Sequence, residues 1–314
     1  MEPSHGNQNT SNFCGGRSVI VHLIDGTYEL YRQHFGQVAR HSSSSPVAAT
    51  GGVLNSTLQL LANGATHVAV SIDKVIESFR NDLWDGYKDS SGMEPVLFEQ
   101  LPFLEEALIA LGVAVWPMVK YEADDALAAA ALLADRHDQV QQVQILTPDK
   151  DLGQCVRGNR VVQFDRRNDV IINEDAVREK YSVSPASITD WLGLVGDSAD
   201  GFPGLSGWGA KSASAVLSVY EHIENIPHDV NEWTKDSVTV RGAAKLASTL
   251  ADNYDNALLF KKLATLVTDV SDDVQIGTVE DWKWQGPTSA LASVAQQVGN
   301  LRLVDRADEI ASHL

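Results

Sequence analysis

Three carboxylates crowd into four consecutive positions of the chain, at Glu122, Asp124 and Asp125. They stand directly before an apolar run, residues 126–134, which predicts a helix that begins at these acids. Like charges this close repel one another, and a divalent cation held by oxygen ligands is the simplest compensation. The alternative is an ordinary N-terminal cap, because helices commonly carry Asp and Glu in their first turn. This stretch alone favours neither interpretation.

Four more acids follow predicted strands. Apolar runs with the length of buried strands lead into them: residues 18–24 into Asp25, 67–72 into Asp73, and 143–146 into Asp149, with Asp151 two positions later. A single Asp at a strand end is most often a turn former. The whole set, together with the acids at 122–125, is harder to explain as turns and caps.

Helical stretches alternate with the strands. Residues 53–62 and 102–111 have helical periodicity, whereas 38–52, with a serine run and the pair Gly51-Gly52, predicts a loop. Shorter strands are expected at 113–116, 161–164 and 170–172. This order predicts an α/β fold, a mainly parallel central sheet flanked by helices. Because the carboxyl ends of parallel strands share one edge, the acids should converge there as a metal site.

The chain changes character after about residue 190. Residues 196–201 add Asp197 and Asp200, and a glycine-rich stretch then leads into a helix at 215–220. Such a helix begins with unpaired N–H groups that suit a phosphate, and Lys211 and Ser212 lie where they can add contacts. The alternative is a plain helical hairpin, although four glycines and a proline exceed what a turn requires. Helices are also expected at 241–266 and 288–298, with Trp282 and Trp284 as packing residues.

Composition sets wider limits. The chain has 314 residues, ordinary hydrophobic content and a net charge of −18. Acidity counts against a nucleic-acid partner, but the charge halves if nine acids hold cations. Residues 1–17 predict a disordered tail with no secretory signal, and no apolar run is long enough for a membrane. Only two cysteines, Cys14 and Cys155, are present, which fits a reducing cytoplasm.

Together these stretches resemble the bacterial 5′–3′ exonuclease and flap endonuclease family, which includes the N-terminal nuclease domain of DNA polymerase I. The resemblance rests on YEADD at 121–125, TPDKDL at 147–152 and the glycine-rich run 196–213, and it covers roughly residues 18–310. It implies a PIN-like 5′ nuclease core at 18–189, with an arch at about 80–102. A C-terminal helix–hairpin–helix (H3TH) region is implied at 190–314. No polymerase sequence accompanies these parts, so we expect a free-standing nuclease.

The resemblance also implies roles for individual residues. Two or more Mg²⁺ or Mn²⁺ ions are implied at nine acids: Asp25, Asp73, Glu122, Asp124, Asp125, Asp149, Asp151, Asp197 and Asp200. Lys88 and Arg80 match basic residues that steady the scissile phosphate. The hairpin is implied to grip duplex DNA, with K⁺ on its carbonyls in family members, through Gly204, Ser206, Gly207, Gly209, Lys211 and Ser212.

The expected function is therefore that of a metal-dependent, structure-specific 5′ nuclease. It would act as a monomer on DNA with a 5′ end, nick or flap, in replication and repair. Two alternatives stay open at this point. A PIN-type ribonuclease has acids on a similar sheet but usually lacks the hairpin. A catalytically silent junction-binding protein would be expected to lack some of the metal acids.

Two departures from the family pattern stand out. The segment 89–100 contains Asp89, Glu94 and Glu99 but no Lys or Arg. Because phosphate contacts supply most of the sequence-independent affinity for DNA, we expect the arch to hold a long single-stranded 5′ arm poorly. Gly201 stands where the family pattern has Asn, and since the neighbouring acids are present we expect little effect on metal binding.

Overall fold

A six-stranded sheet forms the centre of the protein in the computed structural model, which describes residues 19–38 and 46–314. The predicted tail, Cys14 and the serine run at 42–45 lie outside these residues. The strands are β1 (Val19–Asp25), β2 (His67–Asp73), β3 (Ala114–Met118), β4 (Val140–Leu146), β5 (Val161–Asp165) and β6 (Val170–Ile172). They are ordered β3-β2-β1-β4-β5-β6, and only β5 and β6 pair antiparallel. The predicted mainly parallel sheet is confirmed.

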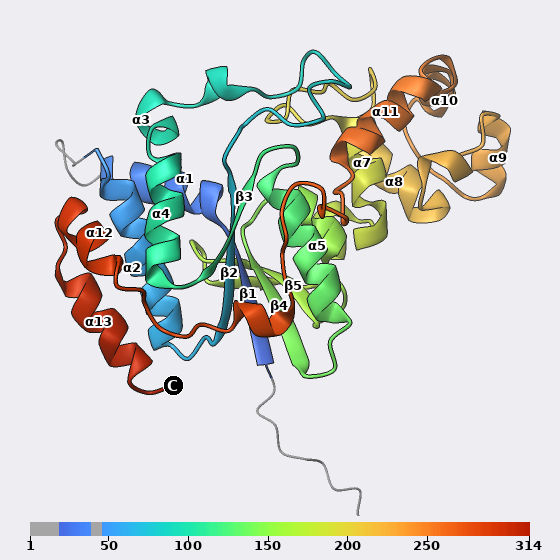
Figure 1. Cartoon of the computed structure of the whole chain (residues 1–314). Helices are drawn as coiled ribbons and strands as arrows, with labels where there is room; N and C mark the ends of the chain where they lie inside the picture. The colour runs from blue at the N-terminus through green and yellow to red at the C-terminus, as the bar shows by residue number, and fades with distance from the viewer. Residues whose placement is uncertain (1–18, 39–45) are drawn as a thin grey trace, which may run out of the picture.

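Helices cover both faces of this sheet (Figure 1). On one side lie α1 (Gly26–Val38), α2 (Ala48–Ala62), the short α3 (Pro95–Phe98) and α4 (Leu101–Leu111). On the other side lies α5 (Ala123–Asp135), which contacts β1, β2, β3 and β4. Because both faces are covered, the central strands β1 and β2 are buried on both sides and appear in the sequence as mostly apolar runs.

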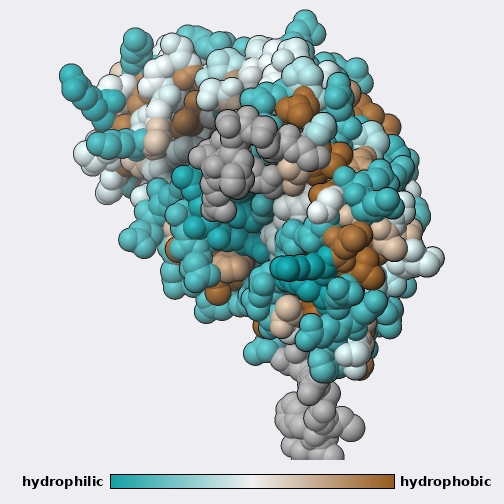
Figure 2. All heavy atoms as spheres, turned by 90° about the vertical axis from the view of Figure 1, so that its left-hand side faces the viewer, coloured by the Kyte–Doolittle hydropathy of each residue, from teal (hydrophilic) through white to brown (hydrophobic). Residues whose placement is uncertain are grey.

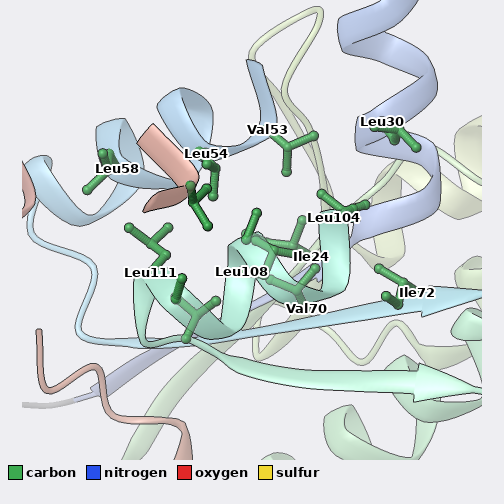
Figure 3. Packing of buried hydrophobic residues seen from close by; sticks show 14 of the residues in the cluster. Ile24, Leu30, Val53, Leu54, Leu58, Val70, Ile72, Leu104, Leu108 and Leu111 are labelled. Atoms are coloured by element: carbon green, nitrogen blue, oxygen red, sulfur yellow. The ribbon is translucent and has the colours of Figure 1, made fainter. Parts of the chain in front are cut away.

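Alternate strand residues enter two separate cores. Val68, Val70 and Ile72 pack under α1, α2 and α4, whereas Ala69 faces α5. Figure 3 shows the first of these cores, where Ile24, Val70 and Ile72 lie against leucines of α2 and α4. Full burial of one such side chain contributes about 1.5–3 kcal/mol, so the two cores fix the register of the strands and the positions where they end.

A third core belongs to the helices that follow the sheet: α6 (Glu174–Tyr181), α7 (Ile188–Val195), α8 (Ala210–Tyr220), α9 (Val230–Lys235), α10 (Ala243–Asp252) and α11 (Tyr254–Ala264). Tryptophans and Phe260 fill it. The chain then returns to the sheet, where α12 (Leu291–Gln297) contacts α4 and α13 (Arg302–Ala311) contacts α2. Trp282 and Trp284 are buried packing residues, as predicted. The boundary at residues 189/190 stays a prediction.

The loop predicted at 38–52 is wrong for its last residues, because α2 begins at Ala48 and includes Gly51 and Gly52. The helix start has no capping side chain of its own, so the sequence gives no signal there. Instead Gln100, from the adjoining helical segment, accepts hydrogen bonds from the Thr50 N–H and hydroxyl, both at 3.2 Å. A Cβ on Gly51 would lie 3.4 Å from Val298, an ordinary contact distance, so α2 packs here against the end of α12.

Three further differences occur near the C-terminus. The helix predicted at 241–266 is divided at Asn253 into α10 and α11, and the one at 288–298 is shorter, spanning Leu291–Gln297. A last helix, α13, was not predicted. Its apolar residues Leu303, Ala307 and Ile310 recur at helical spacing, which is the signal that could have revealed it.

The outer surface beside α1, α2 and α13 is mostly hydrophilic, with hydrophobic side chains in small separate groups (Figure 2). Within residues 19–38 and 46–314, every helix is too short or too polar to cross a bilayer.

The first helix offers a test of how tightly the sheet edge is packed. A Cβ on Gly26 would lie 2.5 Å from Ile72 and 2.9 Å from the Ser71 carbonyl oxygen, whereas on Gly36 it would meet no described atom within 4 Å. We expect Gly26→Ala to lower the free energy of unfolding by about 1–3 kcal/mol. Gly36→Ala, the control, should leave it unchanged or raise it by up to about 1 kcal/mol. Urea denaturation measures both, and equal effects would contradict this packing.

Candidate active site

The carboxyl ends of β1, β2 and β4 bring the strand-terminal acids together, and backbone contacts hold them there. Asp25 Oδ1 accepts a hydrogen bond from the Tyr28 N–H at 2.8 Å, and its Oδ2 accepts one from the Thr147 hydroxyl at 3.2 Å. Asp73 Oδ1 accepts one from the Ala123 N–H at 2.7 Å, at the start of α5. The parallel strands therefore place these acids beside the acid-rich helix, as the sequence predicted.

The acids form two groups. In the first, Asp73 and Asp149 lie close enough to raise the pKa of Asp25, and Asp25, Asp149 and Asp73 help to raise that of Asp124. Asp151, Asp197 and Asp200 form the second group, in which one carboxylate oxygen from each lies within 4.8 Å of the others. Asp149 Oδ1 accepts a hydrogen bond from the Asp151 N–H at 2.9 Å and so joins the two groups.

Two lysines partly neutralise this charge. Lys88 Nζ lies 2.7 Å from Glu122 and 2.9 Å from Asp200 and so links α5 to the second group. Lys150 Nζ lies 2.5 Å from Asp197. The sequence analysis identified Lys88 but missed Lys150, although Lys150 stands between Asp149 and Asp151 in the TPDKDL stretch. Its position between two candidate ligands was the available signal.

The burial and crowding of these acids shift their pKa values. Burial, followed by repulsion from Asp73 and Asp149, raises the pKa of Asp25 to about 7. Burial is also the largest cause of the raised pKa values of Asp73, Asp124, Asp151 and Asp200. Glu122 is the exception: burial alone would raise its pKa, but Lys88 and Arg80 outweigh that effect and lower it. Without further cations, the site therefore retains protons at pH values where isolated carboxyls have already lost theirs.

Arg80 and Asp125 pair with each other and with none of the acids in the two groups. Their side chains are 1% and 0% exposed, and Arg80 Nη1 and Nη2 each lie 2.8 Å from an oxygen of Asp125. Glu122 and Asp125 also form a capping box at the start of α5, so the capping interpretation is confirmed for these two acids. The structure thus places Arg80 in a buried ion pair, not on the open surface where a phosphate contact was expected.

The hairpin expected to hold DNA connects α7 to α8. Gly204 has a φ of +64°, and a Cβ there would lie 2.3 Å from the Gly196 N, so only glycine fits. Ser206, Gly207, Gly209 and Lys211 are exposed, and the Ser212 hydroxyl accepts a hydrogen bond from the Gly209 N–H at 2.9 Å. The predicted DNA-binding residues therefore gather on one exposed turn, which remains a predicted contact surface.

The backbone at residues 200–201, just before the hairpin, is hydrogen-bonded to the base of the predicted arch. The Lys88 N–H donates to the Asp200 carbonyl oxygen at 2.9 Å, and Trp84 Nε1 donates to the Gly201 carbonyl oxygen at 3.1 Å. A Cβ on Gly201 would lie 2.0 Å from the Gly86 carbonyl oxygen, so the Asn of the family pattern would not fit here without a shift. Gly201 therefore lets the segment that carries Lys88 lie directly against the second acid group.

The donor set fits divalent cations. All candidate ligands are carboxylate oxygens, which Mg²⁺ and Mn²⁺ prefer. Asp151 Oδ1 is buried without a hydrogen-bond partner, although it lies beside Asp197 and Asp200. A buried polar atom of this kind is costly unless something binds it. A cation among these three acids would supply that partner and would offset their mutual repulsion.

The raised pKa values predict how acidity affects cation binding. Because the pKa of Asp25 is about 7 when folded and 3.8 ordinarily, folding takes up protons between these values, and apo stability falls as pH rises through this interval. His22, which burial keeps neutral with a pKa of about 4, acts in the opposite direction up to about pH 6.5. Because the His22 contribution is the same with and without metal, it cancels when the two stabilities are subtracted. The stabilisation gained on adding Mg²⁺ should therefore increase from about pH 5 to about pH 7.

Urea denaturation in EDTA and in Mg²⁺, at several pH values, measures this difference. Asp25→Asn should reduce its pH dependence, because the variant has no proton to lose at this position. A stabilisation by Mg²⁺ that is independent of pH in the unmodified protein would contradict the expectation.

Comparison with known proteins supports the same interpretation. Two sequence models match consecutive parts of the chain: the 5′–3′ exonuclease N-terminal resolvase-like domain at 20–182 and the 5′–3′ exonuclease C-terminal SAM fold at 183–290. The 5′–3′ exonuclease of Aquifex aeolicus is 30% identical over 295 residues, which cover 92% of this chain and 96% of that protein. DNA polymerase I of Pseudomonas aeruginosa is 33% identical over 268 residues, or 81% of this chain but only 28% of the polymerase.

Solved structures agree in fold. A zinc-bound T5 5′-exonuclease matches with a TM-score of 0.62 at 18% identity, and the alignment covers 93% of this chain and 98% of that one. The catalytic core of Rad2 in complex with a DNA substrate matches with a TM-score of 0.58 at 15% identity, covering 94% and 92%. With the sheet, the acids and the hairpin arranged as described, the chain belongs to the 5′–3′ exonuclease family.

Proposed function

We propose that this chain is a divalent-metal-dependent 5′ nuclease that hydrolyses DNA phosphodiesters at junctions between single strand and duplex, such as a nick or a 5′ flap. The observation that carries the proposal is the convergence of two acid groups at one sheet edge, directly beside an exposed hairpin suited to a phosphate backbone. The finer assignments follow the sequence: Mg²⁺ or Mn²⁺ as the metals, K⁺ at the hairpin, and a monomer acting in the cytoplasm.

Eight of the nine acids are proposed to hold the metals: Asp25, Asp73, Glu122, Asp124, Asp149, Asp151, Asp197 and Asp200. Two metal ions at such a site supply an activated water and stabilise the leaving oxygen in phosphodiester hydrolysis. The division of the acids into two groups is consistent with two such positions. The buried surroundings strengthen electrostatic interactions and limit access of bulk water.

Lys88 is the proposed contact to the scissile phosphate. Its side chain is 35% exposed and its ammonium group lies between Glu122 and Asp200, so it is reachable from solvent and close to the proposed metal ligands. The backbone bond from Lys88 to Asp200 fixes it relative to the hairpin. A lysine in this place adds positive charge where negative charge develops on the phosphate oxygens.

A groove beside the hairpin supports duplex binding. Its cavity, of about 380 Å³, lies between α6 and α8, and both Lys180 and Lys211 line it. Neither lysine has an ion-pair partner within 4.0 Å among residues 19–38 and 46–314. In a chain with a net charge of −18, two unpaired lysines on one groove make a local positive surface. A DNA backbone crossing the hairpin would extend along this groove.

Cleavage of a labelled 5′-flap DNA in Mg²⁺ tests the proposed activity. Asp149→Asn should lower the rate by about a hundredfold or more, because a lost ligand removes several kcal/mol of transition-state stabilisation. Asp165→Asn is the matched control, since Asp165 also ends a strand but its carboxylate accepts hydrogen bonds from Arg167 and Asn168 in the β5–β6 turn. Equal rates for both variants, or cleavage of an all-RNA flap as fast as of DNA, would contradict the proposal.

The proposed contact between the hairpin and duplex DNA has a separate test. Lys211→Ala should remove about one phosphate contact and reduce the slope of log affinity against log salt by about 0.9. Lys235→Ala is the control, because Lys235 is paired with Glu232 on α9. Fluorescence anisotropy with a nicked duplex at several salt concentrations measures both slopes. If Lys211→Ala left the slope unchanged, the hairpin would not be the contact surface.

A further inference from the structure

We propose that Asp125 and Arg80 form a buried positioning pair, and that neither binds metal or phosphate. The resemblance implied a metal role for Asp125 and a phosphate role for Arg80, so the proposal reassigns both residues. It rests on the proposed function only where it takes the neighbouring acids as metal ligands. The contacts of the two side chains, their location and their connections carry the argument.

Every hydrogen-bonding position of Asp125 is occupied. Oδ1 accepts bonds from Arg80 Nη2 and from the Val267 N–H, both at 2.8 Å. Oδ2 accepts bonds from Arg80 Nη1 at 2.8 Å and from the Glu122 N–H at 2.9 Å. A carboxylate offers about four lone-pair positions, so none is left for a cation. Asp151 is the opposite case, because its buried Oδ1 has no partner.

Arg80 is equally saturated. Nε donates to the Leu263 carbonyl oxygen at 2.8 Å, and Nη2 donates to the Thr265 carbonyl oxygen at 3.1 Å as well as to Asp125. Nη1 donates to Asp125 and, at 3.0 Å, to Glu122 Oε1. All five N–H donors of the guanidinium are therefore used. To reach a phosphate, Arg80 would have to leave these bonds and a position that is 99% buried.

The pair joins three segments that are far apart in sequence. Arg80 lies at the base of the predicted arch, Asp125 in the first turn of α5, and Leu263 to Val267 at the end of α11. Helix α11 packs against α7, which leads directly into Asp197 and the hairpin. The pair therefore fixes the helix that carries Glu122 and Asp124 relative to the region that carries Asp197, Asp200 and the proposed DNA grip.

Glu122 is held in the same arrangement. Its Oε1 accepts bonds from Arg80 and, at 2.9 Å, from the Ser78 hydroxyl, while its Oε2 faces Lys88. Arg80 thus orients one carboxylate oxygen of Glu122 inward and leaves the other toward the cluster. Loss of the pair would move Glu122 and Asp124 together, without removing any metal ligand.

Three variants separate positioning from ligation: Asp125→Asn, Arg80→Lys, and Asp124→Asn as the matched control one position away. Asp124→Asn removes an acid from the cluster, whereas Arg80→Lys alters no carboxylate at all. For each variant we would measure the melting temperature of the metal-free protein, Mn²⁺ binding from the electron paramagnetic resonance signal of the free ion, and single-turnover cleavage of a nicked duplex. The first two measurements do not depend on activity.

We expect Asp125→Asn and Arg80→Lys to behave alike. Each should lower the melting temperature by about 5–10 °C, because one partner of a buried ion pair is left poorly compensated. Each should weaken Mn²⁺ binding by less than about tenfold, as for residues that act through a ligand, and slow cleavage to an extent that excess Mn²⁺ does not restore. Asp124→Asn should weaken Mn²⁺ binding more strongly without lowering the melting temperature, since it relieves repulsion.

Two results would overturn the proposal. One is a loss of Mn²⁺ affinity in Asp125→Asn equal to that in Asp124→Asn, with an unchanged melting temperature. The other is an Arg80→Lys variant of normal melting temperature that binds DNA more weakly, which would place Arg80 on the phosphate. If Asp125→Asn does not fold, Arg80→Lys still decides between these outcomes. Normal Mn²⁺ binding in Asp124→Asn would instead contradict the proposed metal site and leave the pair untouched.

Discussion

Repulsion between carboxylates is the constraint on which this structure depends. Two like charges 4 Å apart interact with about 4 kcal/mol at an effective dielectric constant of 20, and the active site gathers eight acids around one sheet edge. Three kinds of compensation operate in the metal-free protein. Protons remain on acids such as Asp25, the lysines Lys88 and Lys150 pair with acid oxygens, and backbone N–H groups donate to Asp25 and Asp73. Each of them leaves part of the charge unbalanced, so the site favours cations.

That compensation comes from segments that only the complete fold brings together. The sheet supplies Asp25, Asp73 and Asp149, whereas Asp197 and Asp200 come from the helical region after α7. Contacts from Trp84 and Lys88 to the 200–201 backbone hold the two parts against each other. The second acid group therefore exists only when the helical region is docked. A site assembled in this way ties the position of the acids to the region proposed to hold DNA.

Much of the sheet and of the acid cluster could be predicted from the sequence, because both depend on local patterns. A strand covered on both faces is an unbroken apolar run, and an acid directly after it lies at the carboxyl edge. The start of α2 could not be predicted in this way, since its capping partner, Gln100, is 50 positions away. The same holds for Gly201, whose requirement for glycine comes from the Gly86 carbonyl oxygen. Local patterns carry no information about such distant partners.

The acids at 122–125 show the same limit within a single motif. Residues three apart on a helix share a face, so Glu122 and Asp125 lie on one side while Asp124 points elsewhere. The shared face meets Arg80, and Asp124 meets Asp25 and Asp149. Capping and cation binding are therefore not alternatives for the motif as a whole, because Asp125 serves only the first, Asp124 is proposed for only the second, and Glu122 takes part in both. The spacing of the three acids predicts that Asp124 points away from Glu122 and Asp125. Only the position of Arg80, 45 residues before Asp125, identifies the side of the helix on which the buried ion pair forms.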